Sequence, residues 1–282
     1  AFAGFAGRVL RVRRGEDTGE AASPRGRGNL VHRAIEGAFL AARDLGANAE
    51  PRRMMMAARE GAERALGADP ASPMAPLRRE AMAQAVNDAL GAVAHAIEHD
   101  DGVRFAMAEK AFGPREQAPW GALELGADLD EEPAEDAGPV FVKGTIDRVD
   151  RTTDGRRARV VDYKTGKLPD LGELGKSLFQ LPIYAEVVSR CLGSAEIDAV
   201  YVRVRLGGIV EEKPSEKDAA RRVSHPIDRV AAMRAFRRVV LRQWRGDVAP
   251  RPISAAICGS CDARDVCRRP AVMPLEEDAE AD

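Results

Sequence analysis

Two aspartates and a lysine in the middle of the chain have the spacing of a metal-assisted hydrolytic site. Asp162 and Lys164 are two residues apart in VVDYKTGK (160–167). They therefore point to the same face of a strand, because side chains alternate between faces. Asp147 lies in an earlier strand-like segment, PVFVKGTIDRVD (139–150). Carboxylate oxygens suit Mg²⁺ or Mn²⁺, and a lysine beside such an ion can stabilise developing negative charge or position a water molecule.

The turn between these two strands predicts which residues face each other. Asp154-Gly155 is a preferred two-residue hairpin turn, and a hairpin centred on it pairs residues whose numbers add to 309. Asp147 then lies opposite Asp162, with Cβ atoms about 5 Å apart. Two like charges at that distance destabilise a sheet unless a cation lies between them, so the register predicts a metal site. Solvated charges on a surface hairpin are the alternative interpretation.

Four further side chains are candidates for the same site. His32 and Glu36, in HRAIE, are one helical turn apart. A lone helical histidine is more often structural, but an imidazole can serve as a third metal ligand. Gln180 and Tyr184, in QLPIY, have the same i,i+4 spacing in the segment after the hairpin. We expect them to hydrogen-bond a phosphate or a base of the strand to be cut.

The elements that must position these residues follow a mixed α/β pattern. The first third of the chain predicts helices over 29–45, opened by a capping Asn29, and over 51–66 and 76–99. Strands are predicted over 104–112, 139–150, 158–166 and 199–207, and helices over 176–192 and 226–246. Residues 121–138 are acidic and rich in Gly and Pro, which predicts an exposed loop. The fold class is therefore α/β, with a small mixed central sheet flanked by helices.

The composition sets limits on the class of protein. The 282 residues carry a formal charge of -2 and are 45% hydrophobic and 31% charged, which is typical of a soluble globular protein. No apolar run approaches the roughly 20 residues that span a bilayer, and the N-terminal stretch does not read as a signal peptide, so a cytoplasmic location is expected. A polyanion-binding surface would have to be local, in patches such as 8–14 or 234–245, which are otherwise solvated helix faces.

Three of the four cysteines are clustered near the C-terminal end. Cys258, Cys261 and Cys267 are spaced C-x2-C-x5-C, and Cys191 stands apart from them. In a chain without secretory signals, such a cluster favours a metal or iron–sulfur site over a disulfide framework.

Taken in order, these segments resemble the PD-(D/E)XK nuclease superfamily. The closer resemblance is to its RecB/AddB-type nuclease domains with an iron–sulfur cysteine cluster. The matching segments are GNLVHRAIE (28–36), GTIDRVD (144–150), VVDYKTGK (160–167), QLPIY (180–184) and CGSCDARDVC (258–267). The resemblance implies a restriction-endonuclease-like core in a single nuclease domain over 1–273, followed by an acidic tail at 274–282. Within that domain it implies a helical part (28–100), a catalytic sheet and helix (104–207) and a helix with the cysteine region (226–270).

The resemblance also implies roles for individual residues. The implied ligands of Mg²⁺ or Mn²⁺ are His32, Asp147, Asp162 and the backbone carbonyl of Tyr163. Lys164 matches the catalytic lysine of the family, and its glutamine and tyrosine match Gln180 and Tyr184. Glu36 follows His32 at the family spacing, with no role assigned. The implied reaction is metal-assisted hydrolysis of a phosphodiester.

For the cysteines, the resemblance implies a 4Fe-4S cluster on Cys258, Cys261 and Cys267. The fourth ligand would be a cysteine upstream of Ala1, because AFAGFAGRVL resembles the stretch just after the first cysteine of the family. The chain is therefore expected to be a domain of a longer protein. Cys191 is a poor substitute, since it follows the QLPIY segment. A Zn²⁺ site on the same three thiolates is the alternative.

The function expected from the resemblance is that of a DNA nuclease domain, acting as a single-strand exonuclease in an AddAB/RecBCD-like helicase–nuclease during double-strand-break repair. The helicase motor would lie upstream or in a partner subunit, because DLGELGKS (170–177) lacks the first glycine of a phosphate-binding loop. The alternatives are an iron–sulfur exonuclease of CRISPR adaptation and a silent DNA-binding or scaffold module. The arginines expected along the path of the strand, or on a merely solvated face, are Arg234, Arg237, Arg238, Arg242 and Arg245.

Overall fold

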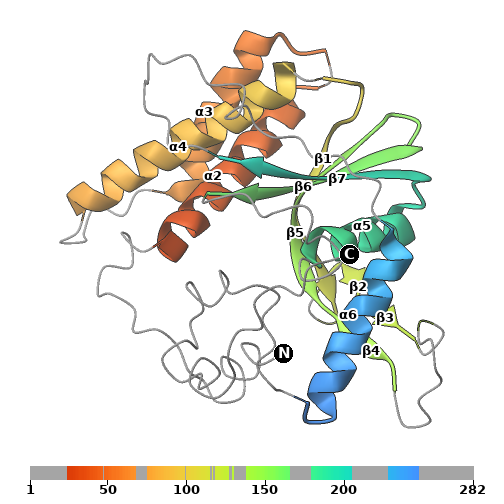
Figure 1. Cartoon of the computed structure of the whole chain (residues 1–282). Helices are drawn as coiled ribbons and strands as arrows, with labels where there is room; N and C mark the ends of the chain where they lie inside the picture. The colour runs from red at the N-terminus through yellow and green to blue at the C-terminus, as the bar shows by residue number, and fades with distance from the viewer. Residues whose placement is uncertain are drawn as a thin grey trace, which may run out of the picture.

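Helices cover both faces of a five-stranded mixed sheet (Figure 1). The computed structural model describes residues 24–46, 48–67, 75–98, 100–114, 116, 118–126, 129, 138–165, 179–204 and 228–247. The strand order is β2-β1-β5-β6-β7, in which β1, β5 and β6 are antiparallel neighbours and β6 and β7 are parallel. This arrangement confirms the predicted α/β class. None of the helices in the described parts of the chain has the length and apolar character needed to cross a membrane.

The elements follow one another in a simple order. The helices α2 (Pro24–Asp44), α3 (Pro51–Leu66) and α4 (Ala75–Glu98) come before the main sheet. The strands of that sheet are β1 (Arg104–Gly113), β2 (Trp120–Gly121), β5 (Gly144–Arg151), β6 (Arg157–Lys164) and β7 (Glu196–Arg203). An antiparallel pair, β3 (Leu123–Leu125) and β4 (Val140–Val142), forms a second small sheet. Helix α5 (Gln180–Leu192) connects the parallel strands β6 and β7, and α6 (Arg229–Trp244) follows them.

The alternation of β6 divides the apolar core into two clusters. Val161 and Tyr163 belong to a cluster with the buried faces of α2, α3 and α4. Val160 belongs to a second cluster with α5 and α6. Because successive side chains of a strand point to opposite faces, one strand anchors both helical layers. Polar side chains at its C-terminal end therefore lie where the two layers meet the sheet.

Two glycines bring α2 and α3 into backbone contact. A Cβ atom at Gly37 would overlap the carbonyl oxygen of Gly61, and a Cβ atom at Gly61 would overlap that of Gly37. The helices can approach this closely only because neither position has a side chain. The contact fixes α2, the helix that carries His32, against the rest of the helical layer.

The hairpin of β5 and β6 has the predicted register but a longer loop. Arg148 pairs with Val161 and Val149 with Val160, so paired numbers add to 309 as expected, but among the described residues the paired run ends there, one position before Asp147 and Asp162. The predicted two-residue turn is wrong, because the loop closes with a hydrogen bond of 3.0 Å from Thr152 N–H to the carbonyl of Arg157. Gly155 adopts a φ of 72° within this loop. The loop is centred on the same two residues, so lengthening it leaves the register unchanged.

Three other boundaries differ from the sequence prediction. Helix α2 begins at Pro24, so Asn29 lies inside it and does not cap it; proline is favoured at the first helical position. The predicted loop 121–138 contains β3, in which buried leucines alternate with exposed Glu124. The predicted strand 139–150 is interrupted at Lys143, because β4 pairs with β3 while β5 pairs with β1. The predicted acidic tail, 274–282, lies outside the described residues.

Candidate active site

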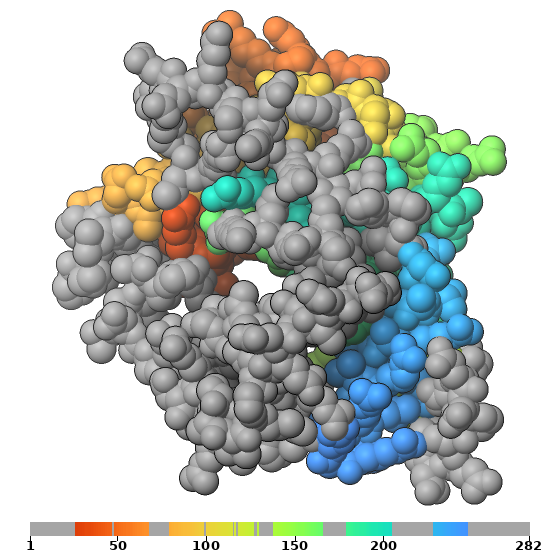
Figure 2. Space-filling model, viewed as in Figure 1, coloured from red at the N-terminus to blue at the C-terminus, as the bar shows by residue number. Residues whose placement is uncertain are grey.

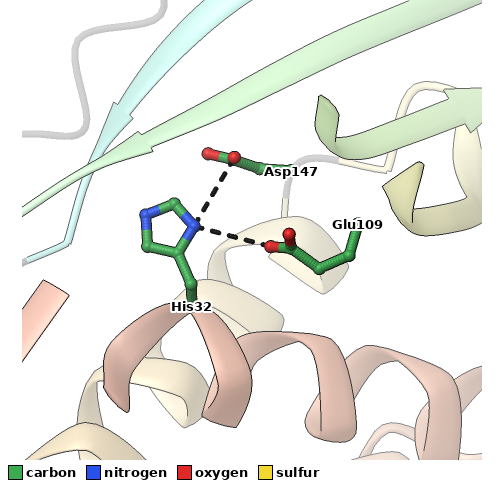
Figure 3. A group of neighbouring side chains, drawn as sticks. All are labelled: His32, Glu109 and Asp147. Atoms are coloured by element: carbon green, nitrogen blue, oxygen red, sulfur yellow. Dashed lines mark ion pairs between the residues drawn. The ribbon is translucent and has the colours of Figure 1, made fainter. Parts of the chain in front are cut away.

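Three side chains from three elements meet at one point beside the sheet (Figure 3). Nδ1 of His32 lies 3.5 Å from Oε1 of Glu109 and 3.5 Å from Oδ1 of Asp147. One possible ligand atom from each residue lies within 4.8 Å of the others. An imidazole and two carboxylates are donors that suit a divalent cation, and the group shares His32 and Asp147 with the ligand set predicted from the sequence.

The backbone is irregular where the two carboxylates lie. Ala108 pairs with Arg148 and Lys110 with Ile146, which places Glu109 between these pairs, across from Asp147. Glu109 has a φ of 44°, unusual for a residue with a side chain, and such a conformation is unfavourable by about 1 kcal/mol or more. On β5, Ile146 and Val149 belong to the same cluster although they are three residues apart. Both strands therefore leave regular alternation here, as often happens at functional sites.

The two carboxylates favour a positive charge on or beside His32. Hydrogen bonds to Asp147 and then Glu109, opposed by burial, raise the pKa of His32 to about 10. Without a metal ion the imidazole is therefore protonated at neutral pH. Glu36, one turn along α2, has a raised pKa, first because of burial and then because of the charge of Glu109. The raised pKa values of His32 and Glu36 show that the carboxylates of this group favour a positive charge between them.

Asp162 lies on the next strand, β6, and is only 1% exposed. Burial, and then the charge of Asp147, raise its pKa to about 6. Its Oδ2 atom is 2.5 Å from Nζ of Lys164. Among the described residues, the compact group of possible ligands contains Glu109 and not Asp162. The backbone N–H of Tyr163, the next residue, donates to Oδ2 of Asp147 at 2.8 Å.

A chain of polar contacts links the lysine to the glutamine and tyrosine of α5. Nζ of Lys164 donates to Oε1 of Gln180 at 2.9 Å, and it lies 5.2 Å from the centre of the Tyr201 ring. Nε2 of Gln180 donates to the hydroxyl of Tyr184 at 3.2 Å. Burial raises the pKa of Tyr184 to about 12, so this hydroxyl keeps its proton at neutral pH. The segments DYK and QLPIY therefore contribute to one continuous polar arrangement.

A family model described as the PD-(D/E)XK nuclease superfamily matches residues 2–268. The chain belongs to this superfamily. Its members are typically metal-dependent nucleases, and the group formed by His32, Glu109 and Asp147 is consistent with such a centre. A comparison with curated proteins returned no match.

Within this PD-(D/E)XK domain, sequence reasoning missed Glu109. The glutamate lies in RFAMAEKAF, where it reads as one polar position of an alternating strand. The signal that identifies it is structural, because it depends on the pairing of β1 with β5 and on the position of α2. A carboxylate next to a lysine within the mostly apolar run 105–112 was the hint that the sequence offered.

One of the arginines expected along a DNA path is a structural residue of the domain. Arg237 is 0% exposed, and its Nη1 donates to the carbonyls of Leu125 and Gly138 at 2.8 and 3.0 Å. It cannot contact a DNA strand, because its guanidinium holds β3 and the start of the β4 segment against α6. The exposed arginines of this helix region are Arg234, Arg238, Arg242 and Arg245. Figure 2 shows α6, in blue, along one side of the surface.

The predicted cluster ligands of the domain, Cys258, Cys261 and Cys267, lie outside the described residues. Cys191 lies near the end of α5 and is exposed. Partial burial of the thiol raises its pKa, which favours the neutral form.

Proposed function

We propose that the chain is a DNA nuclease domain that acts as a single-strand exonuclease in a helicase–nuclease of AddAB or RecBCD type. The strongest support is that two sets of polar side chains lie close together. The first set is the group of His32, Glu109 and Asp147, and the second is the series of contacting side chains Asp162, Lys164, Gln180 and Tyr184. The two sets lie on neighbouring strands of one sheet and on the helices that cover it. The helicase, in the same polypeptide or in a partner subunit, is proposed from the order of the sequence motifs alone.

The first set supplies the ligands of the proposed centre. His32, Glu109 and Asp147 would hold Mg²⁺ or Mn²⁺, with Asp162 and the carbonyl of Tyr163 as further ligands proposed from the resemblance. Such an ion supplies Lewis-acid activation of water and of the scissile phosphate. The high pKa of His32 means that its proton must leave when the imidazole becomes a ligand.

The second set places a positive charge where the phosphate reacts. Hydrolysis adds a water oxygen to phosphorus, breaks the bond to the leaving oxygen and delivers a proton to that oxygen. Lys164, held between Asp162 and Gln180, stabilises the negative charge that grows on the phosphate oxygens. Tyr184 accepts from Gln180 and retains its own proton, with which we expect it to donate to a phosphate oxygen.

Cleavage of end-labelled single-stranded DNA with Mg²⁺ or Mn²⁺ tests this function. We expect Asp147→Asn and Lys164→Ala to abolish cleavage. Asp154→Asn is a matched control, because Asp154 lies at the exposed loop of the same hairpin. Substrates with blocked ends, duplex DNA and RNA define the preference. A folded wild type that binds DNA without cutting it would favour the silent binding module instead.

We also propose that Cys258, Cys261 and Cys267 bind a 4Fe-4S cluster together with a further cysteine. The support is their C-x2-C-x5-C spacing and the resemblance described above. Iron, sulfide and zinc contents of protein purified without oxygen distinguish this cluster from a zinc site. Zinc without iron would overturn the assignment.

A further inference from the structure

Three buried polar residues, Arg148, Asp150 and Tyr163, form a hydrogen-bonded triad that adjoins the candidate metal centre through Tyr163. Arg148 forms a bidentate ion pair with Asp150, with Nε to Oδ1 at 2.5 Å and Nη2 to Oδ2 at 2.7 Å. Its third nitrogen, Nη1, donates to the hydroxyl of Tyr163 at 3.0 Å. The three residues are 8%, 1% and 2% exposed. The guanidinium is therefore fixed in place by partners on two neighbouring strands.

Stability alone does not account for this triad. Replacing a buried ion pair by apolar side chains of similar volume is often neutral or stabilising, because the charges must be taken out of water. A hydrogen-bonded triad differs from apolar packing because hydrogen bonds are directional, so each one fixes the orientation of the side chain that it joins. The question is then which groups the triad holds in place.

Tyr163 connects the triad to two of the proposed ligands. Its backbone N–H donates to Oδ2 of Asp147 at 2.8 Å, which orients that carboxylate. Its ring lies edge-on to the imidazole of His32, with centroids 6.5 Å apart. The hydroxyl held by Arg148 and the backbone that holds Asp147 belong to one residue, so the position of its ring and that of the carboxylate are coupled.

Arg148 also contacts the helix that carries His32. Its guanidinium carbon lies 4.1 Å from the centre of the Phe39 ring, within the range of a cation–π contact. Phe39 and His32 are seven residues apart on α2, which is about two turns, so they lie on the same side of the helix. The contact helps to fix the position of α2 over the sheet.

We propose that Arg148, oriented by Asp150, is a positioning residue that keeps His32 and Asp147 at the spacing of metal ligands. It acts through Tyr163 and Phe39 and contacts neither substrate nor metal. The inference rests on the proposed function, because it assumes a cation at His32, Glu109 and Asp147. It adds a role for the arginine and second aspartate of GTIDRVD that the ligand set does not explain.

The test measures Mn²⁺ binding by electron paramagnetic resonance to protein freed of divalent cations, independently of DNA cleavage. Tyr163→Phe removes only the hydroxyl that Arg148 holds. Arg148→Lys keeps the charge opposite Asp150 and loses the planar fork that reaches Tyr163. We expect each variant to raise the Kd for Mn²⁺ about tenfold, as removal of outer-shell partners of metal ligands does. The double variant should bind Mn²⁺ no more weakly than Arg148→Lys alone, because the lysine has already lost the contact with the Tyr163 hydroxyl.

Val86→Ala is the control for a general loss of stability. Val86 is buried on α4 in the same apolar cluster, and it is not one of the proposed ligands or their partners. We expect its Kd for Mn²⁺ to stay within about twofold of wild type, even when its melting temperature falls as far as that of Tyr163→Phe.

The proposal is overturned if Tyr163→Phe and Arg148→Lys bind Mn²⁺ like wild type, or if Val86→Ala weakens binding equally. Failure of the proposed function gives a different result. In that case the wild type binds Mn²⁺ without cutting DNA, and the affinities of the variants still decide the role of Arg148.

Discussion

Nζ of Lys164 lies 2.9 Å from Oε1 of Gln180, so the lysine of β6 is tethered to the first turn of α5. Gln180→Ala removes this acceptor and leaves the proposed metal ligands in place. We expect the single-turnover cleavage rate at saturating Mn²⁺ to fall roughly tenfold to a hundredfold, because the ammonium group of Lys164 is no longer held in position to stabilise the charge on the phosphate. The Kd for Mn²⁺ should not change. Gln84→Ala, on the outer part of α4, should alter neither quantity.

Glu109→Gln tests whether the ligand set is the one that the structure brings together. Loss of a direct ligand should weaken Mn²⁺ binding at least tenfold, since even outer-shell changes have effects of this size. Isothermal titration of Mn²⁺ measures the effect, and Glu124→Gln, an exposed glutamate of β3, is the matched control. If Glu109→Gln binds Mn²⁺ with the wild-type Kd while Asp162→Asn binds it more weakly, Asp162 is a ligand and Glu109 is not, as predicted from the sequence.

Metal affinity should depend steeply on pH. The pKa of His32 in the metal-free site is about 10, so binding below this pH must displace a proton. The raised pKa favours the protonated imidazole, and affinity must therefore increase as the pH rises. We expect up to about a tenfold gain per pH unit near neutrality, with a further loss of affinity below about 6, where Asp162 takes up a proton. His32→Gln should flatten the dependence near neutral pH, and an unchanged slope in that variant would contradict the assignment.

The contact of α2 with α3 predicts an effect on stability at a distance from the chemistry. Gly37→Ala introduces a methyl group that overlaps the carbonyl of Gly61, so the helices must move apart. We expect the free energy of unfolding to fall by about 1–3 kcal/mol in chemical denaturation. Gly91→Ala, in open space on α4, should instead stabilise by about 0.5–1 kcal/mol, because alanine favours the helix. Equal effects at the two positions would argue against a tight crossing.

The two types of arginine on α6 should respond differently to the same substitution. Arg237→Met leaves the carbonyls of Leu125 and Gly138 without their buried donor, so we expect a loss of about 2 kcal/mol of stability. Arg234→Met, on the exposed side, should change stability by less than about 0.5 kcal/mol. If this side follows the DNA, Arg234→Met should also lower the salt dependence of single-strand binding by about one ion. A salt dependence equal to that of wild type would remove α6 from the path.

The sequence was most informative where contacts are local. The register of β5 with β6 follows from the centre of one turn, and it survived an error in the length of that turn. The pairing of β1 with β5 has no such local signal, because a long acidic segment separates them, and so Glu109 was missed. Arg237 was misassigned for a related reason. Helical periodicity identifies an amphipathic helix, but it does not show that the backbone carbonyls of Leu125 and Gly138 will accept hydrogen bonds from one of its arginines.

The two halves of the candidate site differ in how far apart their parts lie along the chain. Asp147, Asp162, Lys164 and Gln180 come from consecutive elements, β5, β6 and α5, whereas His32 comes from the first described helix. Contacts between nearby segments form with less loss of loop entropy than contacts between distant ones. During folding, the hairpin and α5 should therefore assemble the lysine's surroundings first, before the histidine arrives. Until α2 docks, the chain would already hold Lys164 beside Asp162 and Gln180 but would lack His32, so it could not form the proposed metal site.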